Sequence, residues 1–179
     1  MARKSNNKQA TVKSDVEISN EEVSIQPEIA GGNEQAEVTA DVPVDHFTNI
    51  VLDGKALKLS PKTVNHVFYE LSEHDELKVL YLRLSGNEGG GLHSKEWIAI
   101  DDVFTLLNEQ EDKPFKSTVF KSAFKGSSAN NTGFLAACCR GLGLIIPTEK
   151  SVFLHQLAPD YEQRREELLS LVDGETKSE

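Results

Sequence analysis

The first regular alternation of apolar and polar residues in the chain begins near His46. The stretch FTNIVLDGKALKLS alternates loosely, and it contains Asp53-Gly54, a pair that favours a tight turn between two strands. The pattern therefore predicts a β-hairpin with strands over about 48–52 and 55–59.

Helical spacing follows the predicted hairpin. Ser60-Pro61 combines a preferred N-cap residue with proline at the first helical position, and the next apolar residues recur every three or four positions. A second start signal comes at Ser72, which is followed three residues later by Asp75. The two apolar stripes predict two helices, and they consist of Val64, Val67, Phe68 and Leu71, then Leu77, Leu80, Tyr81 and Leu84.

Loops and short regular elements alternate in the middle of the chain. Residues 85–94 are rich in glycine and predict a loop, and 96–100 predicts a short strand. Asp101 is placed to cap the helix that follows. A further helix is expected over 115–125, where it would end at Gly126.

The most patterned stretch is SSANNTGFLAACCRGLGLIIPTEKSVFLHQL, residues 127–157. A serine precedes a helix predicted over 128–142, and one side of this helix is apolar. The inward-facing residues are Phe134, Leu135, Cys138 and Leu142. Two short apolar runs then flank the Pro-Thr-Glu-Lys turn at 147–150, which predicts a strand, a tight turn and a returning strand. Pro159-Asp160 opens a final amphipathic helix.

From about residue 72 to 160 the order of these elements resembles the winged helix-turn-helix superfamily. The local match is FLAACCRGLGLIIPTEKSVFLHQLAPDY, in which a leucine-bearing helix ends at Gly-Leu-Ile and a hairpin follows. The resemblance implies a mainly α-helical fold with small β-hairpins. It also implies that the helix at 128–142 occupies the recognition position and that 147–151 forms the tip of the wing.

The ends of the chain differ in composition from its middle. Residues 1–45 contain no aromatic side chain and show no sustained hydrophobic period. They carry four basic and nine acidic groups. The expected organisation is a disordered tail over 1–45, a winged-helix-like domain with a leading β-hairpin over 46–158, an amphipathic helix over 159–173 and a disordered end over 174–179.

Charge is distributed unevenly along the chain. The net charge is −10, but residues 113–150 hold six basic side chains against Glu149 and, counted this way, have a local net charge of +5. A positive segment on an acidic protein is compatible with contacts to phosphate groups. A chance surplus of lysines on a solvated face explains the same count equally well.

The exposed side of the predicted 128–142 helix determines how DNA would be contacted. With the apolar side inward, the outward residues are Ala129, Thr132, Gly133, Ala136, Ala137 and Arg140. Most are too short to reach base edges, so the expected contacts are mainly with phosphates and only weakly specific for sequence. Asn130 either contacts a base or caps the helix. The candidate DNA-binding residues are Lys116, Lys121, Lys125, Asn130, Thr132, Arg140 and Lys150.

Other classes of function have little support in the sequence. The five histidines are scattered, and neither a catalytic triad nor a metal-binding spacing is evident, so we expect no enzyme, no metal and no cofactor. The adjacent Cys138 and Cys139 predict reduced thiols in a cytoplasmic protein. No apolar run is long enough to span a membrane.

Two functions therefore remain. The first is a DNA-binding winged helix that acts on double-stranded DNA as a regulator or accessory factor. The alternative is a winged-helix module for protein–protein interaction in a larger assembly, in which the C-terminal helix contacts a partner or a second copy of the chain.

Overall fold

The computed structural model describes residues 44–111 and 113–172, and a four-stranded antiparallel sheet is its largest element. The strands are β1 (Asn49–Leu57), β2 (His66–Glu73), β3 (Leu80–Asn87) and β4 (Ile98–Ala99), and they lie side by side in chain order. The predicted tail over 1–45 lies almost entirely outside the described residues. The predicted end over 174–179 lies entirely outside them.

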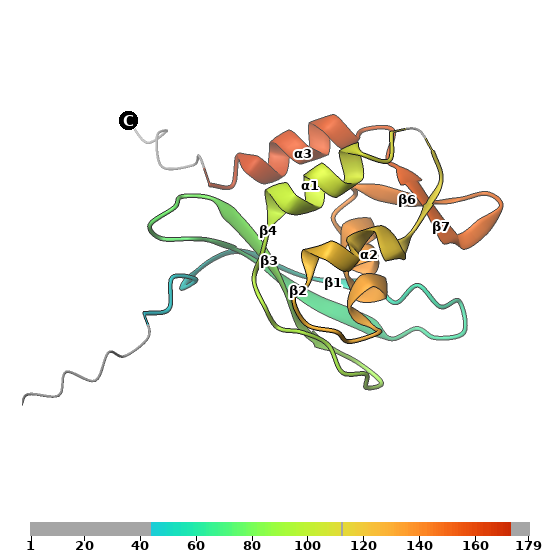
Figure 1. The fold of residues 1–179 in the computed structure, drawn as a ribbon, viewed down its shortest axis with the longest axis horizontal. Helices are drawn as coiled ribbons and strands as arrows, with labels where there is room; N and C mark the ends of the chain where they lie inside the picture. Colours follow the sequence, from blue (N-terminus) through green and yellow to red (C-terminus); the bar gives the residue numbers. More distant parts are fainter. Residues whose placement is uncertain (1–43, 112, 173–179) are drawn as a thin grey trace, which may run out of the picture. The chain divides into compact units, whose positions relative to one another are not determined.

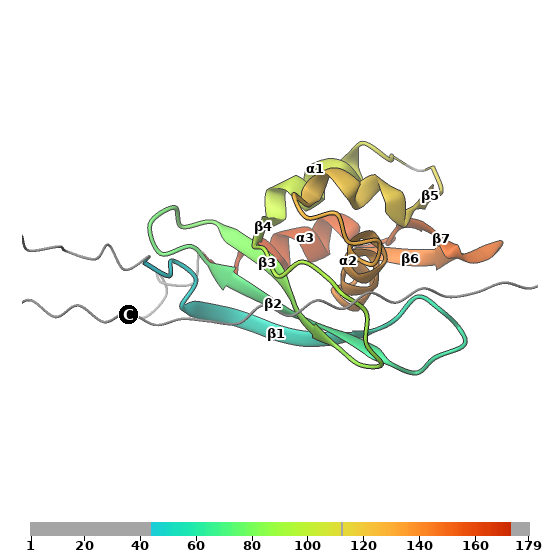
Figure 2. The ribbon, with the colours of Figure 1, turned by 60° about the horizontal axis from the view of Figure 1, so that its bottom comes forward.

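Helices and a second sheet complete the described part of the chain. The helices are α1 (Ile100–Asn108), the 3-10 helix η1 (Ser117–Ala123), α2 (Asn131–Gly141) and α3 (Tyr161–Leu169). The second sheet contains β5 (Phe115–Lys116), β6 (Ile145–Thr148) and β7 (Ser151–Leu157) in the order β5-β7-β6. Figures 1 and 2 show that the helices lie on one face of the four-stranded sheet.

The prediction of a mainly α-helical, winged-helix-like domain is wrong, because both helices expected between residues 60 and 84 are strands. In β2 and β3 every second residue is buried, with Leu71 and Leu82 paired across the two strands and fully enclosed. The apolar residues fit a helical period and also a period of two. Pairing between neighbouring strands decides in favour of the sheet, since it buries one whole face of each strand.

The predicted hairpin at Asp53-Gly54 is also wrong, because both residues lie inside the single strand β1. Gly54 is needed there for another reason. A Cβ atom at this position would lie 2.5 Å from Cζ of Tyr69, which is the partner of Gly54 on β2. The glycine therefore makes room for an aromatic ring in the core rather than for a turn.

Helix α2 is present within the predicted range, but its predicted outward face is wrong at Ala136 and Ala137. Ala136 and Ala137 are fully buried, as are the expected inward residues Leu135 and Cys138. The helix is enclosed because it contacts β1 and β2 on one side and η1 and β6 on others. Its small residues allow close approach to the protein's own sheet: a Cβ atom on Gly141 would lie only 2.8 Å from Cβ of Ala56.

The remaining elements match the sequence more closely. The hairpin β6–β7 confirms the predicted wing-like strands, and α3 lies in the range predicted for the last helix. Helix α1 begins at Ile100, so Asp101 lies in its first turn instead of capping it, where its charge favours the helix dipole. The helix predicted over 115–125 is a short strand followed by η1, because Phe115 pairs with His155 in the second sheet.

Replacing Gly141 by alanine tests the close contact between α2 and β1. Alanine favours helices, but its methyl group would collide with Ala56, which cannot move without shifting the strand. Gly133→Ala in the same helix is the matched control, since a Cβ atom there meets nothing within 4 Å. In urea unfolding we expect Gly141→Ala to be less stable than Gly133→Ala by about 1–3 kcal/mol. Equal stabilities would show that the helix can move away from the sheet at no cost.

Candidate functional site

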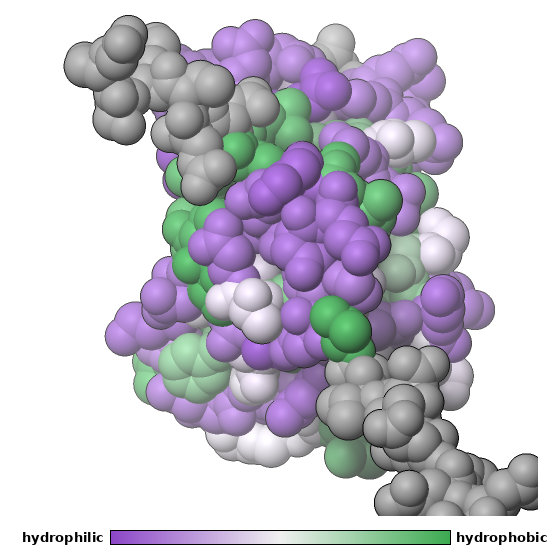
Figure 3. All heavy atoms as spheres, turned by 90° about the vertical axis from the view of Figure 1, so that its left-hand side faces the viewer, coloured by the Kyte–Doolittle hydropathy of each residue, from purple (hydrophilic) through white to green (hydrophobic). Residues whose placement is uncertain are grey.

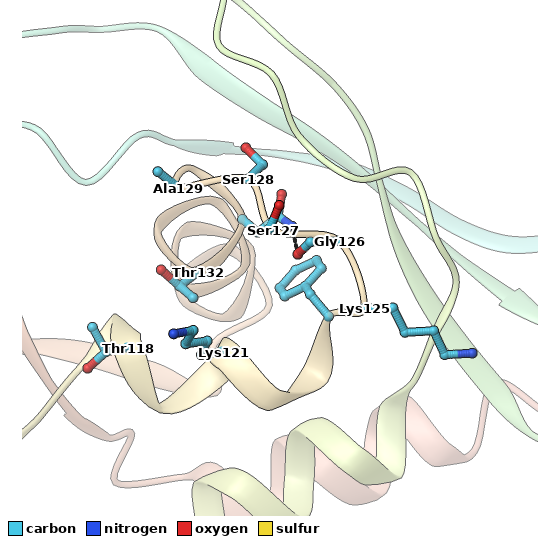
Figure 4. Close-up of a pocket in the computed structure, with 10 residues that line it drawn as sticks. Thr118, Lys121, Lys125, Gly126, Ser127, Ser128, Ala129 and Thr132 are labelled. Carbon is cyan, nitrogen blue, oxygen red and sulfur yellow. Dashed lines mark hydrogen bonds between the residues drawn. The ribbon is translucent and has the colours of Figure 1, made fainter.

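A cleft lined by polar groups lies between η1 and the start of α2, and we call it the η1–α2 cleft (Figure 4). Its volume is about 460 Å³. The lining residues are Thr118, Lys121, Phe124, Lys125, Gly126, Ser127, Ser128, Ala129, Asn131 and Thr132. They supply hydroxyl groups, two ammonium groups and one aromatic ring, and none of them is acidic.

The loop between η1 and α2 is held in place by Glu96. Its carboxylate accepts hydrogen bonds from the backbone N–H groups of Lys125 (3.1 Å) and Gly126 (3.1 Å) and from the Ser94 hydroxyl (2.6 Å). Burial acts to raise the pKa of the Glu96 carboxyl, but these hydrogen bonds outweigh it and lower the pKa below its ordinary value. Glu96 therefore stays ionised and fixes the wall of the cleft.

Asn131 provides a second fixed point beneath the cleft. Its side chain is almost fully buried, accepts a hydrogen bond from the Ser94 backbone N–H (2.9 Å) and donates one to the Gly126 carbonyl (3.2 Å). A buried amide with both ends satisfied holds the two segments in one arrangement. The polar groups around the cleft are consequently preorganised.

Three exposed lysines lie immediately before η1, within it and just after it. Lys116, Lys121 and Lys125 are all exposed, and within the described residues none of them forms a salt bridge, whereas Lys78 pairs with Glu73 and Lys113 with Glu111. In Figure 4 the Lys125 side chain extends away from the other labelled residues, and Lys121 lies near Thr118 and Thr132. Lys121 and the hydroxyl-bearing Thr118 and Thr132 thus line the same cleft.

The structure brings together only some of the predicted DNA-binding residues. Lys121, Lys125 and Thr132 line the η1–α2 cleft, and Lys116 directly precedes η1. Lys150 lies apart from them in the turn between β6 and β7. Asn130 occupies the N-cap position of α2, but its side chain donates a hydrogen bond to the Leu92 carbonyl instead of capping the helix, and base contact stays a prediction.

Arg140 contacts the hairpin β6–β7 and does not point to the cleft. Its guanidinium donates to Nδ1 of His155 (3.2 Å from Nε) and to the Val152 carbonyl (2.6 Å from Nη2). His155 is fully buried, and burial together with the charge of Arg140 lowers the pKa of its imidazole to about 4. This pair joins α2 to β7 through a neutral histidine.

The two cysteines offer no reactive thiol. Both are fully buried in α2, as predicted for Cys138. Burial raises the pKa of the Cys139 thiol to about 12, and it raises that of Cys138 well above its ordinary value. Because the thiolate is the reactive form, neither residue is suited to nucleophilic chemistry.

A second cluster was missed by the sequence interpretation. His46, His74 and Asp75 come together at the turn between β2 and β3, with potential ligand atoms within 4.8 Å of one another. The histidines are far apart in the sequence, so spacing gave no signal for them. The sequence pattern at His74-Asp75-Glu76 favours the start of a helix, so it does not indicate that these side chains meet His46.

Comparisons of the chain with protein-family models, with curated proteins and with solved structures found no match. Within residues 44–111 and 113–172, no helix combines the length and the apolar composition that crossing a membrane requires.

Proposed function

We propose that this protein binds the phosphate backbone of double-stranded DNA through the η1–α2 cleft and the lysines around it. The observation that carries the proposal is the pair of exposed lysines Lys121 and Lys125 in a cleft without acidic lining residues, with the exposed Lys116 directly before η1. Hydroxyl and ammonium groups are the usual partners of phosphate oxygens in protein–DNA contacts. In a protein with a net charge of −10, such a local surplus is where a polyanion would meet the least repulsion.

The buried position of α2 bears on the kind of binding. A helix that reads bases must enter the major groove with exposed side chains. Ala136 and Ala137 are enclosed, and Arg140 is held by His155 and Val152. Contacts with phosphates through η1 and the start of α2 would therefore depend little on the DNA sequence.

One other observation favours a protein partner as the second candidate. A groove of about 480 Å³ lies between the β1–β2 loop, α2 and β7, and its lining includes Leu57 and Val152. Leu57 is 59% exposed, and Phe153, next to Val152, is 54% exposed. Exposed apolar side chains beside a groove are typical of surfaces that contact other proteins.

Charge reversal at the cleft tests the DNA proposal. We expect Lys121→Glu with Lys125→Glu to abolish binding to a labelled random-sequence duplex at low salt, because each change removes an attraction and adds a repulsion. The matched control is Lys55→Glu with Lys62→Glu, which makes the same change in net charge at two exposed lysines outside the cleft. The control should bind within a few-fold of the wild type, and circular dichroism should show both variants folded.

The salt dependence adds a second readout. Three phosphate contacts predict that the logarithm of the association constant falls with the logarithm of salt concentration with a slope of about −2.7. A wild type that does not bind at low salt would reject the proposal in favour of the apolar groove. Equal binding by the cleft variant and the control would place the DNA contact elsewhere on the chain.

A further inference from the structure

The cluster at the β2–β3 turn joins two segments that are distant in the sequence. His46 lies just before β1, and His74 and Asp75 lie just after β2. The two imidazole rings stack with their centroids 4.8 Å apart and their planes 8° from parallel. Asp75 lies beside both, with its Oδ1 atom 2.8 Å from Nδ1 of His46 and 3.6 Å from Nδ1 of His74.

Backbone hydrogen bonds keep these residues near one another. The Asp75 N–H donates to the His46 carbonyl (3.1 Å), which ties the segment before β1 to the turn. The His74 N–H donates to the Val79 carbonyl (2.9 Å), and Lys78 closes the turn by donating to the His74 carbonyl (2.9 Å) with a φ of 53°. Backbone hydrogen bonds, and not only the attraction between the side chains, therefore hold the three side chains close together.

The surroundings leave the cluster open on one side. The His74 side chain is mostly buried, with the Phe47 ring edge-on to it at 5.1 Å, whereas Asp75 is exposed. Glu76 adds another carboxylate, with Oε1 4.0 Å from Nδ1 of His46. Figure 3 views the domain from the end where the β2–β3 turn lies, and much of the surface drawn there is hydrophilic. An ion and its water ligands have access from solvent.

We propose that His46, His74 and Asp75 bind a single divalent transition-metal ion of the zinc class. Imidazole nitrogens and one carboxylate oxygen are a common ligand set for Zn²⁺, and a fourth position suits water or Glu76. A bound ion lies in the plane of each coordinating ring at about 2.0–2.1 Å from the nitrogen. Since the stacked rings share no such point, the more exposed His46 ring turns out of the stack when the ion binds.

The pair His66–Glu88 shows why the second histidine matters. Nδ1 of His66 lies 2.9 Å from Oε2 of Glu88, so this pair has the same histidine–carboxylate contact as His46–Asp75. It is not part of a group of three potential ligands in the described residues. His66→Ala is therefore a matched control that removes an imidazole and a carboxylate contact away from the proposed site.

The experiment is a titration of the full, tag-free and chelator-treated chain with Zn²⁺ by calorimetry. All five histidines and both cysteines lie among the described residues, so the remaining segments contribute neither ligand type. We expect one ion per chain. His46→Ala and Asp75→Asn should each weaken binding at least about tenfold, because even partners of metal ligands contribute that much. His66→Ala should bind as the wild type does.

Trp97 gives an independent readout of where the ion binds. It is the single tryptophan of the chain, and it stacks on Phe47 at 4.6 Å, next to the proposed site. Cu²⁺ should quench its fluorescence in the wild type, and Zn²⁺ should reverse the quenching by competition. Both effects should be lost in His46→Ala, whose fold is checked by circular dichroism.

Two results would overturn the proposal. One is the absence of Zn²⁺ binding at millimolar concentration. The other is binding that survives in both His46→Ala and Asp75→Asn, which would assign the ion to other groups and leave the cluster as an ordinary histidine–carboxylate contact.

Discussion

Replacing Phe104 by alanine is expected to lower the free energy of unfolding by about 3–5 kcal/mol. Phe104 lies in α1 and is 1% exposed. Its ring meets the Tyr161 ring of α3 edge-on at 6.5 Å, and the guanidinium of Arg165 lies 5.3 Å from its centroid. Alanine would leave a cavity between two helices that the surrounding core cannot fill, and would also remove both aromatic contacts.

Urea unfolding monitored by circular dichroism measures this loss. Phe153→Ala is the matched control, because it deletes the same side chain at a position that is 54% exposed on β7. The control should change stability by less than about 1 kcal/mol, since little apolar surface is lost from the core. Similar losses in the two variants would mean that α1 and α3 do not pack as described.

Acid is expected to destabilise the domain through His155. The pKa of this histidine is about 4 in the folded protein, against an ordinary value of 6.5, because burial and the nearby Arg140 disfavour the charged form. Between these two pH values the unfolded chain binds more protons than the folded one. Stability is therefore fully present above about pH 6.5 and is lost as the pH falls toward 4, by about 3 kcal/mol in total.

His155→Gln isolates this contribution from those of other groups. Glutamine does not titrate, and its side-chain oxygen can accept the hydrogen bonds that Arg140 now donates to Nδ1. His46 acts in the opposite direction, since its hydrogen bond with Asp75 raises its pKa, so the wild type alone is not diagnostic. We expect the variant to lose less stability than the wild type between about pH 7 and pH 4.5. Parallel losses would show that His155 accepts a proton without cost.

The sequence predicted the second half of the fold better than the first. Around α2 and the hairpin β6–β7, local signals agree with the structure, although Pro147 and Thr148 of the predicted turn belong to β6 and the turn itself is Glu149-Lys150. Between residues 60 and 84 the apolar residues fit two periods at once. Val67 and Leu71 are spaced for a helix, but together with Tyr69 they also form one face of a strand. Pairing with neighbouring strands decides between helix and strand, and a short stretch of sequence does not show which strands will pair.

The candidate sites also differ in how far the sequence predicts them, because a local stretch of sequence does not show which distant residues meet in the fold. The lysines of the η1–α2 cleft are close in the sequence, so the sequence alone indicates their surplus of positive charge. The outward face of α2 is wrong at Ala136 and Ala137, because short side chains fit both an exposed helix and a helix that packs against a sheet. His46 and His74 meet only because the segment before β1 returns to the turn after β2, which is a property of the tertiary structure.

The order of strands in the two sheets has a consequence for how the chain folds. In the first sheet each strand pairs with its neighbour in sequence, so every pairing closes only a short loop. In the second sheet β5 pairs with β7, where Phe115 meets His155 across η1, α2 and β6. Closing a longer loop has a larger entropic cost, and non-local pairing slows folding. The β1–β2–β3 meander can therefore form from local encounters, whereas the pairing of β5 with β7 has to close a longer loop that contains η1, α2 and β6.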